Sequence, residues 1–287
     1  TYPGTTEDFL CPILEKKSNL KVVKDFGVGY SPERVDPGNK KFRIENTPNV
    51  VGGLTSEFTE ICAELFDGIT GDIVKVRDCK TAEAVKMIEN IYRNVNIALV
   101  NELALIFEKM DIDIWESIDA ARTKPYGYTP FYPGPGVGGH CIAVDPYFIT
   151  ADFPMESQII GKAREINNYK AFWCAEKIQN TIKNFEVKEK REPVVALMGL
   201  AFKPNIDDLR ESPAKYIASK VMQAYNNADF LIVEPNILEH KVFKLTNYQE
   251  AYEKADIVAF LVAHKEFKEL TWRNDKVILD FCGVFKK

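Results

Sequence analysis

Strand-like and helix-like patterns of apolar residues alternate in the first part of the chain. The spacing predicts a helix over residues 5–18 with Thr5 or Thr6 as its N-cap, a strand over 20–23, a helix over 56–66 and a strand over 72–77. This alternation is typical of a parallel βαβ sheet. Because the chain opens on TYPGTTEDF without the strand that would start such a domain, we expect the domain to begin outside this sequence.

A long helix is predicted from Thr81 to about Met110, with apolar and polar residues on opposite sides at ~100° per residue. The apolar side comprises Ala84, Ile88, Ile91, Val95, Ala98, Leu99 and Ile106. The polar side comprises Lys86, Asn90, Arg93, Asn94 and Asn101. Asparagine is a poor residue inside a helix, so its repetition on one stripe suggests a ligand for the amides. A solvated face is the alternative.

Two further helices are predicted over 111–121 and 161–183. In the second, the residues expected to point inward are Ile166, Tyr169, Ala171, Phe172, Trp173 and Ile178. The two long helices, over 81–110 and 161–183, together have more apolar surface than one core needs. They therefore predict a dimer interface.

A second α/β pattern follows a charged segment, 187–193, that ends in proline and is typical of a linker. It comprises strands over 194–200, 228–233, 257–262 and 276–281 and helices over 213–225 and 248–254. This order predicts a doubly wound parallel sheet. Lys203 and Arg210, in the loop after its first strand, precede a helix N-terminus, where an anion is favoured. Exposed loop charges are the alternative.

Composition limits the possible partners. The chain has 287 residues, 46% of them hydrophobic, and a net charge of -5, which argues against a nucleic acid or an anionic membrane surface as partner. No apolar run approaches the ~20 residues of a membrane span, and the N-terminus does not resemble a signal peptide, so we expect a cytosolic protein. The six cysteines form no CxxC pair, which indicates neither a zinc site nor a redox pair.

The stretch FYPGPGVGGHCIAVDPY, residues 131–147, is predicted to be a constrained loop. Gly138 and Gly139 would let the main chain approach a ligand directly before Cys141, the one cysteine in a loop built for access. Cys62, Cys174 and Cys282 lie among apolar neighbours and are expected to be inert core thiols. A purely structural corner remains the alternative.

Two motifs in this stretch are misleading. Gly134, Gly136 and Gly139 spell G-x-G-x-x-G, but no predicted strand precedes them and prolines crowd them, so they are not a dinucleotide fingerprint. His140 beside Cys141 suggests a cysteine hydrolase. Adjacent side chains diverge, however, and a working base comes from a distant segment, which leaves His240 or His264.

Two pairs of residues elsewhere have chemical potential. Lys86 and Asn90 are spaced i, i+4 and can point at one ligand atom. Glu33 and Arg34 lie in a second Gly/Pro-rich loop, DFGVGYSPERVDPGNK, where a surface ion pair is the simpler interpretation.

With these motifs in order, the chain resembles the UDP-glucose/GDP-mannose dehydrogenase family, in the branch that oxidises UDP-N-acetylhexosamines. The resemblance covers essentially the whole chain through TYPGTTE, GYSPERVDPG, TAEAVKMIENIYRNVNIALVNE, GPGVGGHCIAVDPY and GLAFKPNIDDLRESP. It implies an α/β fold: the remainder of a Rossmann-like NAD-binding domain (1–79), a central long-helix dimerisation domain with the cysteine loop (80–186), and a C-terminal Rossmann-like UDP-binding domain (193–287). The family's NAD fingerprint would lie outside this sequence.

The resemblance implies an NAD-dependent, four-electron oxidation of the sugar C6 hydroxyl to the uronic acid. Cys141 would capture the aldehyde as a thiohemiacetal that becomes a thioester, which water hydrolyses. The resemblance also implies that Lys86 and Asn90 stabilise the oxyanion, that Asp145 positions a water or accepts a proton, and that Glu33 assists thioester hydrolysis as a general base. The implied substrate-binding residues are Arg34, Gly138, Gly139, Lys203 and, across a homodimer, Arg122 or Lys124. Those implied for NAD are Thr1 and Arg210.

Two departures from the glucose-type members bear on the substrate. This chain has Pro37 where those members have a glutamate, and Val144 where they have a lysine. Both favour UDP-N-acetylglucosamine or UDP-N-acetylmannosamine as substrate, and the family implies a role in surface-polysaccharide synthesis. The alternative function is a non-catalytic UDP-sugar-binding and dimerisation fragment, since residues 1–287 alone would not turn over without the NAD fingerprint.

Overall fold

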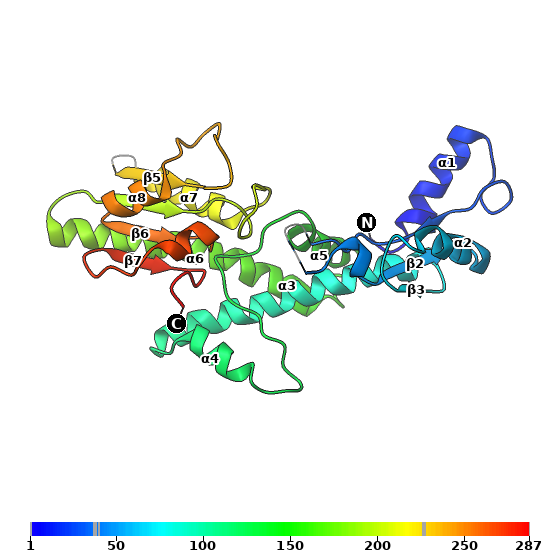
Figure 1. Ribbon diagram of the computed structural model, residues 1–287, viewed down its shortest axis with the longest axis horizontal. Helices are drawn as coiled ribbons and strands as arrows, with labels where there is room; N and C mark the ends of the chain where they lie inside the picture. The colour runs from blue at the N-terminus through cyan, green and yellow to red at the C-terminus, as the bar shows by residue number, and fades with distance from the viewer. Residues whose placement is uncertain (1, 37–38, 40, 226–227, 287) are drawn as a thin grey trace. The chain divides into compact units, whose positions relative to one another are not determined.

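The computed structural model describes residues 2–36, 39, 41–225 and 228–286 and consists of two compact units. One unit runs to Tyr92 and includes Asp145–Ser157; the other comprises Arg93–Val144 and Gln158–Lys287. Helix α3 (Cys79–Lys109) is one continuous helix that contributes residues to both (Figure 1). Helix α5 (Cys141–Asp152) does the same.

The first unit contains a three-stranded sheet in the order β1 (Gly29–Tyr30), β2 (Asn49–Gly53), β3 (Ile73–Lys75). Strands β2 and β3 are parallel and are joined by α2 (Ser56–Phe66), whose first turn is capped by the Thr55 hydroxyl. This confirms the predicted βαβ unit. Strand β1 pairs antiparallel to β2 and was not predicted, because two residues are too short to show a strand period. A short 3₁₀ helix, η2 (Ile44–Asn46), precedes β2.

The chain's first helix begins as a π-helix, η1 (Thr5–Leu10), and continues as α1 (Cys11–Ser18). Its N-cap is Gly4, so the predicted cap at Thr5 or Thr6 is wrong. The carboxylate of Glu83, on α3, accepts hydrogen bonds from the backbone amides of Gly4 (2.6 Å) and Thr6 (2.9 Å) and from the Thr6 hydroxyl (2.7 Å). A distant side chain thus replaces the local cap.

The strand predicted over residues 20–23 does not form. Val23 has a φ of 70°, a left-handed conformation that a strand cannot contain. Carboxylates hold the neighbouring amides instead: Asp25 accepts from the Lys21 amide at 2.7 Å, and Glu15 accepts from the Val22 amide at 3.0 Å. These side chains stabilise a turn that an apolar pattern does not reveal.

In the second unit, a four-stranded parallel sheet has the order β5 (Asp229–Val233), β4 (Val194–Met198), β6 (Ile257–Phe260), β7 (Val277–Asp280). The remaining elements are α4 (Ile114–Ala121), α6 (Gln158–Glu189), α7 (Pro213–Ala224), α8 (Tyr248–Lys254) and a 3₁₀ helix, η3 (Lys265–Glu269). The sheet and its flanking helices are visible in Figure 1. The predicted doubly wound sheet is confirmed.

Both faces of this sheet are buried. Val195 and Leu197 of β4 pack in one cluster with α6 and α7, and Ala196 and Met198 pack in another with α8. Helices therefore cover the sheet on both sides, as a run of strand residues without polar alternation requires.

The inward and outward sides of the two long helices differ from the predictions. Tyr169 and Phe172 of α6 are 51% and 45% exposed, whereas Ala171 and Ile178 are buried as expected. Helix α6 also continues to Glu189, so the predicted linker is partly helical. No helix among the described residues is both long and apolar enough to cross a membrane.

Helix α3 begins at Cys79, before the predicted Thr81, because the Asp78 carboxylate accepts from the Thr81 amide at 2.7 Å and serves as the cap. Its two faces differ in part from a simple apolar-inside prediction, although Ala98 is buried and Arg93 is exposed as predicted. Ile88, Leu99 and Ile106 are 66%, 52% and 46% exposed, and the asparagines at 90, 94 and 101 are buried. Their polar stripe is therefore not the solvated face that was the alternative.

Candidate functional site

Cys141 is the first residue of a helix. The predicted loop therefore ends at His140, and α5 runs from Cys141 to Asp152 with Pro146 inside it, a residue that hid the helix in the sequence. Cys141 is exposed, whereas the other five cysteines are buried or partly buried. Its sulfur is thus accessible at the N-terminal end of a helix.

The other cysteines are shielded. Burial raises the pKa of the Cys174 thiol to about 12, and it likewise raises the pKa of Cys62 and of Cys282. These three thiols are the ones predicted to be inert, and their burial is consistent with that prediction.

At Gly138 and Gly139, the main chain before Cys141 packs closely against the loop between β4 and α7. A Cβ on Gly138 would lie 2.5 Å from the Glu211 carbonyl oxygen, and one on Gly139 would lie 2.9 Å from the Phe202 ring. The Gly139 amide also donates to the carbonyl of Arg210 at 3.1 Å. Within this unit the glycines thus permit a close approach to protein.

The same β4–α7 loop contains Lys203 and Arg210. Lys203 is half-buried and Arg210 is exposed. The Arg210 Nη2 donates to Asp208 Oδ2 at 2.6 Å, and this contact raises the pKa of Arg210 and lowers that of Asp208.

Four other predicted site residues form two contacts within the first unit. Asn90 Nδ2 donates to Asp145 Oδ2 at 2.6 Å, and both side chains are buried, at 5% and 6% exposure. The Lys86 ammonium donates to the backbone carbonyl of Glu33. Asp145 follows Cys141 by four residues on α5 and so lies on the same face of that helix.

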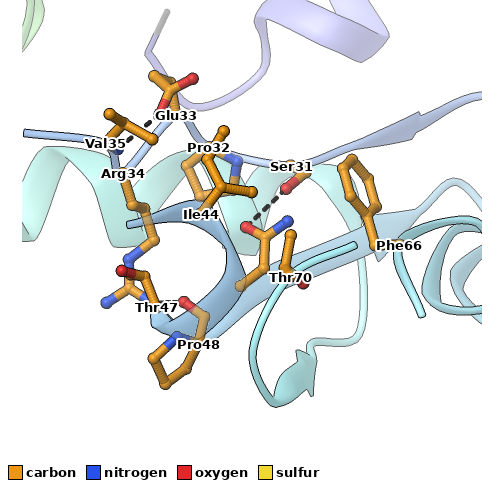
Figure 2. A pocket seen from close by; sticks show the side chains of 11 residues that line it. Ser31, Pro32, Glu33, Arg34, Val35, Ile44, Thr47, Pro48, Phe66 and Thr70 are labelled. Carbon is orange, nitrogen blue, oxygen red and sulfur yellow. Dashed lines mark hydrogen bonds between the residues drawn. The ribbon is translucent and has the colours of Figure 1, made fainter. Parts of the chain in front are cut away.

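Glu33 and Arg34 line a cavity of about 200 Å³ between the loop after β1, the start of β2 and the end of α2. Figure 2 shows the Glu33 carboxylate turned toward Val35, whose amide it accepts, and Arg34 extending toward Thr47 and Pro48. Arg34 pairs with Glu89 of α3 at 2.7 Å. Arg34 thus forms its ion pair with Glu89 and not with the neighbouring Glu33.

Three predicted residues have less structural support. Arg122 and Lys124 are exposed in the segment after α4, and the Lys124 ammonium lies 5.1 Å from the centre of the Tyr126 ring. Thr1 lies outside the described residues.

A cluster of buried amides was not predicted in this form. Asn101 Nδ2 donates to Asn167 Oδ1 at 2.9 Å, and its own Oδ1 accepts from the Gly134 amide at 3.0 Å. Asn167 Nδ2 donates to Asn94 Oδ1 at 3.0 Å, and Arg164 donates to the same oxygen at 3.3 Å. The asparagine stripe on α3 signalled a polar partner, which for Asn94 and Asn101 includes α6 and the loop before Cys141.

The distant histidines have structural partners of their own. His264 is fully buried, with its ring nitrogens against Glu234 and the Asn205 amide. His240 Nδ1 accepts from the amides of Val242 and Phe243 at 3.1 Å. Both imidazoles are thus engaged locally, which weakens the cysteine-hydrolase interpretation. Among the described residues, no group of three or more metal-ligating side chains could hold a metal ion.

The described residues fit a dinucleotide only in part. Strands β2 and β3 with α2 form a βαβ unit, the building block of such domains, but the described residues include no glycine-rich turn that follows a strand and opens a helix. G-x-G-x-x-G at 134–139 precedes α5, yet it follows no strand, and its last two glycines pack on protein. The fit is therefore partial, and the exposed guanidinium of Arg210 is a cation that could bind a phosphate of the dinucleotide.

Comparison with known proteins gives matches along almost all of the chain. The NAD-binding, central and UDP-binding domain models of the UDP-glucose/GDP-mannose dehydrogenase family match residues 1–70, 80–169 and 196–287. The UDP-N-acetyl-D-mannosamine dehydrogenase of Campylobacter jejuni is 40% identical over 97% of this chain and 69% of its own length. That of Escherichia coli (strain K12) is 39% identical over 99% of this chain and 71% of its own length.

A solved structure agrees with the sequence matches. The UDP-D-ManNAc dehydrogenase from Pyrococcus horikoshii superposes with a TM-score of 0.86 at 30% identity and covers 100% of this chain and 68% of that one. The match to the NAD-binding domain identifies NAD as the cofactor. From its three domain matches and its relatives, the chain belongs to the UDP-glucose/GDP-mannose dehydrogenase family of NAD-dependent UDP-sugar dehydrogenases.

Proposed function

We propose that this chain oxidises the C6 hydroxyl of a UDP-N-acetylhexosamine to the carboxylate through a covalent intermediate on Cys141. The observation that supports this most is the exposed thiol at the start of α5, one helical turn before a carboxylate, Asp145, that is bonded to Asn90. NAD supplies the hydride acceptor for each of the two oxidations.

In this proposal Cys141 does the covalent work. Its thiolate adds to the C6 aldehyde, and the carbonyl oxygen takes the negative charge and then a proton, which gives a thiohemiacetal. The oxidised adduct is a thioester, and water adds to its carbonyl to release the uronic acid and the thiol. Covalent capture keeps the reactive aldehyde on the protein between the two oxidations.

The remaining roles are assigned to the residues of the Lys86–Glu33 and Asn90–Asp145 contacts. The Lys86 ammonium and the Asn90 amide stabilise the oxyanion. Asp145 positions the water or accepts its proton, and Asn90 keeps the buried carboxylate in one orientation through the 2.6 Å bond. Glu33 assists thioester hydrolysis as a general base.

For the substrate we propose UDP-N-acetylmannosamine, the sugar nucleotide named for the Campylobacter jejuni and Escherichia coli relatives, with UDP-N-acetylglucosamine as the alternative. Residues proposed for substrate binding are Arg34, Gly138, Gly139, Lys203 and either Arg122 or Lys124. Thr1 and Arg210 are proposed for NAD.

Binding and chemistry can be tested separately. Calorimetric titration with UDP, UDP-N-acetylmannosamine, UDP-N-acetylglucosamine and UDP-glucose should show affinity that depends on UDP and is strongest for an N-acetylhexosamine. The absence of binding for all four would contradict the proposal.

A homodimer is proposed from the exposed apolar stripe of α3. Ile88, Leu99 and Ile106 recur at spacings of eleven and seven residues, which places them on one side of the helix, and all three are about half exposed or more. A second copy of the chain would cover this stripe. Sedimentation equilibrium should then give twice the chain mass.

The alternative is that residues 1–287 bind a UDP-sugar and pair with a second copy but do not turn it over, because the part of the chain that the structure describes contains no glycine-rich phosphate turn after a strand. UDP binding without formation of NADH would support this alternative. NADH formation by these residues alone would contradict it.

A further inference from the structure

A buried carboxylate and imidazole lie at the carboxyl-terminal edge of the β5–β4–β6–β7 sheet. Glu234 follows β5, His264 follows β6, and neither side chain is exposed. The backbone N–H of Asn205, which can only donate, points at His264 Nδ1 at 3.0 Å. Nδ1 is therefore the acceptor, and Nε2 donates its proton to Glu234 Oε2 at 3.1 Å.

This pair holds the first residues of the β4–α7 loop. Glu234 Oε2 also accepts from the backbone amides of Leu200 at 2.7 Å and Ala201 at 2.8 Å. The backbone amide of Asn205 donates to His264, and the Asn205 side-chain Oδ1 accepts from the Lys265 amide at 2.9 Å. The ends of β5 and β6 thus fix the loop from residue 200 to residue 205, at the sheet edge where open α/β folds bind ligands.

The fixed loop in turn supports the main chain before Cys141. Phe202 packs against Gly138 and Gly139 closely enough to exclude a Cβ at either glycine. Farther along the loop, the Arg210 carbonyl accepts from the Gly139 amide at 3.1 Å. A shift of the loop would therefore move the backbone two residues before the thiol, and Lys203 with it.

We propose that Glu234 and His264 are positioning residues that set, through the β4–α7 loop, the place of Lys203 and the seat of Cys141. The part that concerns Lys203 rests on the proposed function, because it assumes a UDP ligand; the part that concerns Cys141 does not.

The test compares substitutions at the two ends of one sheet. Glu234→Gln places an amide NH₂ against at least one donor, because all the acceptor positions of Glu234 in these contacts face N–H groups. The matched control is Asp256→Asn, at the opposite edge of the sheet just before β6. Asp256 also accepts a backbone amide, that of Val194 at 2.9 Å, and pairs with Arg191, but it does not touch the loop.

Two readouts are measured on the 287-residue chain: the rate at which iodoacetamide alkylates Cys141, followed by peptide mass spectrometry, and the Kd for UDP from calorimetry. In Glu234→Gln and His264→Gln we expect alkylation to become faster by about threefold or more and the Kd to rise by about fivefold or more, as the loss of one hydrogen bond to a charged group implies. In Asp256→Asn both should stay within about twofold of the original chain.

Circular dichroism shows which variants are folded. If Glu234→Gln is not, the milder Asn236→Ala, which removes one amide donor to Glu234, is measured in its place and should shift both readouts in the same direction. Equal changes in the control and in the loop variants, or unchanged readouts in folded loop variants, would overturn the inference. Failure of the original chain to bind UDP would instead contradict the proposed function, and the alkylation comparison would still decide the inference.

Discussion

At the residue scale, Asn90 and Asp145 form the tightest contact between two proposed catalytic side chains, 2.6 Å apart and almost fully buried. Asn90→Asp would place two carboxyl groups at this distance, where both cannot ionise, so the folded pKa of one must rise. A raised carboxyl pKa lowers stability as pH increases above the unfolded value.

We therefore expect Asn90→Asp to lower the melting temperature more at pH 8 than at pH 5, and to slow acid formation at both. Thermal unfolding at the two pH values checks this. Asn180→Asp, at an exposed position of α6, is the control and should show little dependence. Equal behaviour of the two variants would mean that Asn90 and Asp145 are not coupled.

Glu234 gives a second prediction at this scale. Burial alone would raise its pKa, but hydrogen bonds from His264 and from the backbone amides of Leu200 and Asn236 outweigh burial and lower it to about 2. A lowered carboxyl pKa adds stability above the unfolded value near 4.5, and this stability is lost as pH falls toward 2. Denaturant unfolding should show Glu234→Gln clearly less stable than the original chain at pH 7, with the difference shrinking below about pH 4.5. A difference independent of pH would contradict this assignment.

Residue chemistry was partly predictable. The thiol at 141 and the spacing of Lys86 and Asn90 are local features, which a sequence shows directly. The contacts of Asn90 with Asp145, of Glu83 with Gly4 and Thr6, and of Glu234 with His264 join residues 30 to 79 positions apart. Such contacts depend on the fold and have no periodic signature.

At the element scale, the long helix α3 uses Asn101 to connect α6 with the loop before Cys141. Asn101→Ala would leave the Gly134 amide without its acceptor and the Asn167 side chain without its donor. Unpaired buried groups cost about 1–3 kcal/mol each, so we expect a loss of roughly 2–4 kcal/mol in the free energy of unfolding. Urea denaturation measures this loss. Glu102→Ala, the exposed neighbouring position, should change it by less than about 0.5 kcal/mol.

Elements with strong local signals were predicted well. Helix α2 and helix α8 have the predicted ends, and the four strands of the second sheet lie within the predicted ranges. Errors arose where nearby carboxylates override the apolar pattern, as Glu15 and Asp25 do at residues 20–23, or where proline conceals a helix, as in α5. The faces of α3 were partly misjudged because apolar side chains were assumed to point inward and polar ones outward, whereas Asn90, Asn94 and Asn101 are buried together with apolar residues such as Ala98.

At the scale of the whole molecule, the proposed dimer predicts a specific sensitivity. Leu99→Glu and Ile106→Glu would place charges on the exposed stripe of α3, and we expect either change to shift the chain to a monomer without loss of helix content. Sedimentation equilibrium with circular dichroism measures both properties. Lys109→Glu, at the end of the same helix, is the control for charge alone. A stripe variant that remains dimeric would contradict this interface.

The three-domain division over 1–79, 80–186 and 193–287 stays a prediction. Helices α3 and α5 each contribute residues to both compact units of the structure. The proposed covalent role of Cys141 can be tested by a direct chemical measurement.

That measurement is uronic acid formation from UDP-N-acetylmannosamine and NAD by the enzyme that contains this chain and by its Cys141→Ser variant, with Cys62→Ser as the control. We expect the Cys141 variant to form acid at a rate lower by a factor on the order of 10³ or more, because the covalent adduct cannot form, while the rate of the control is unchanged. Acid formation by Cys141→Ser at the original rate would contradict it.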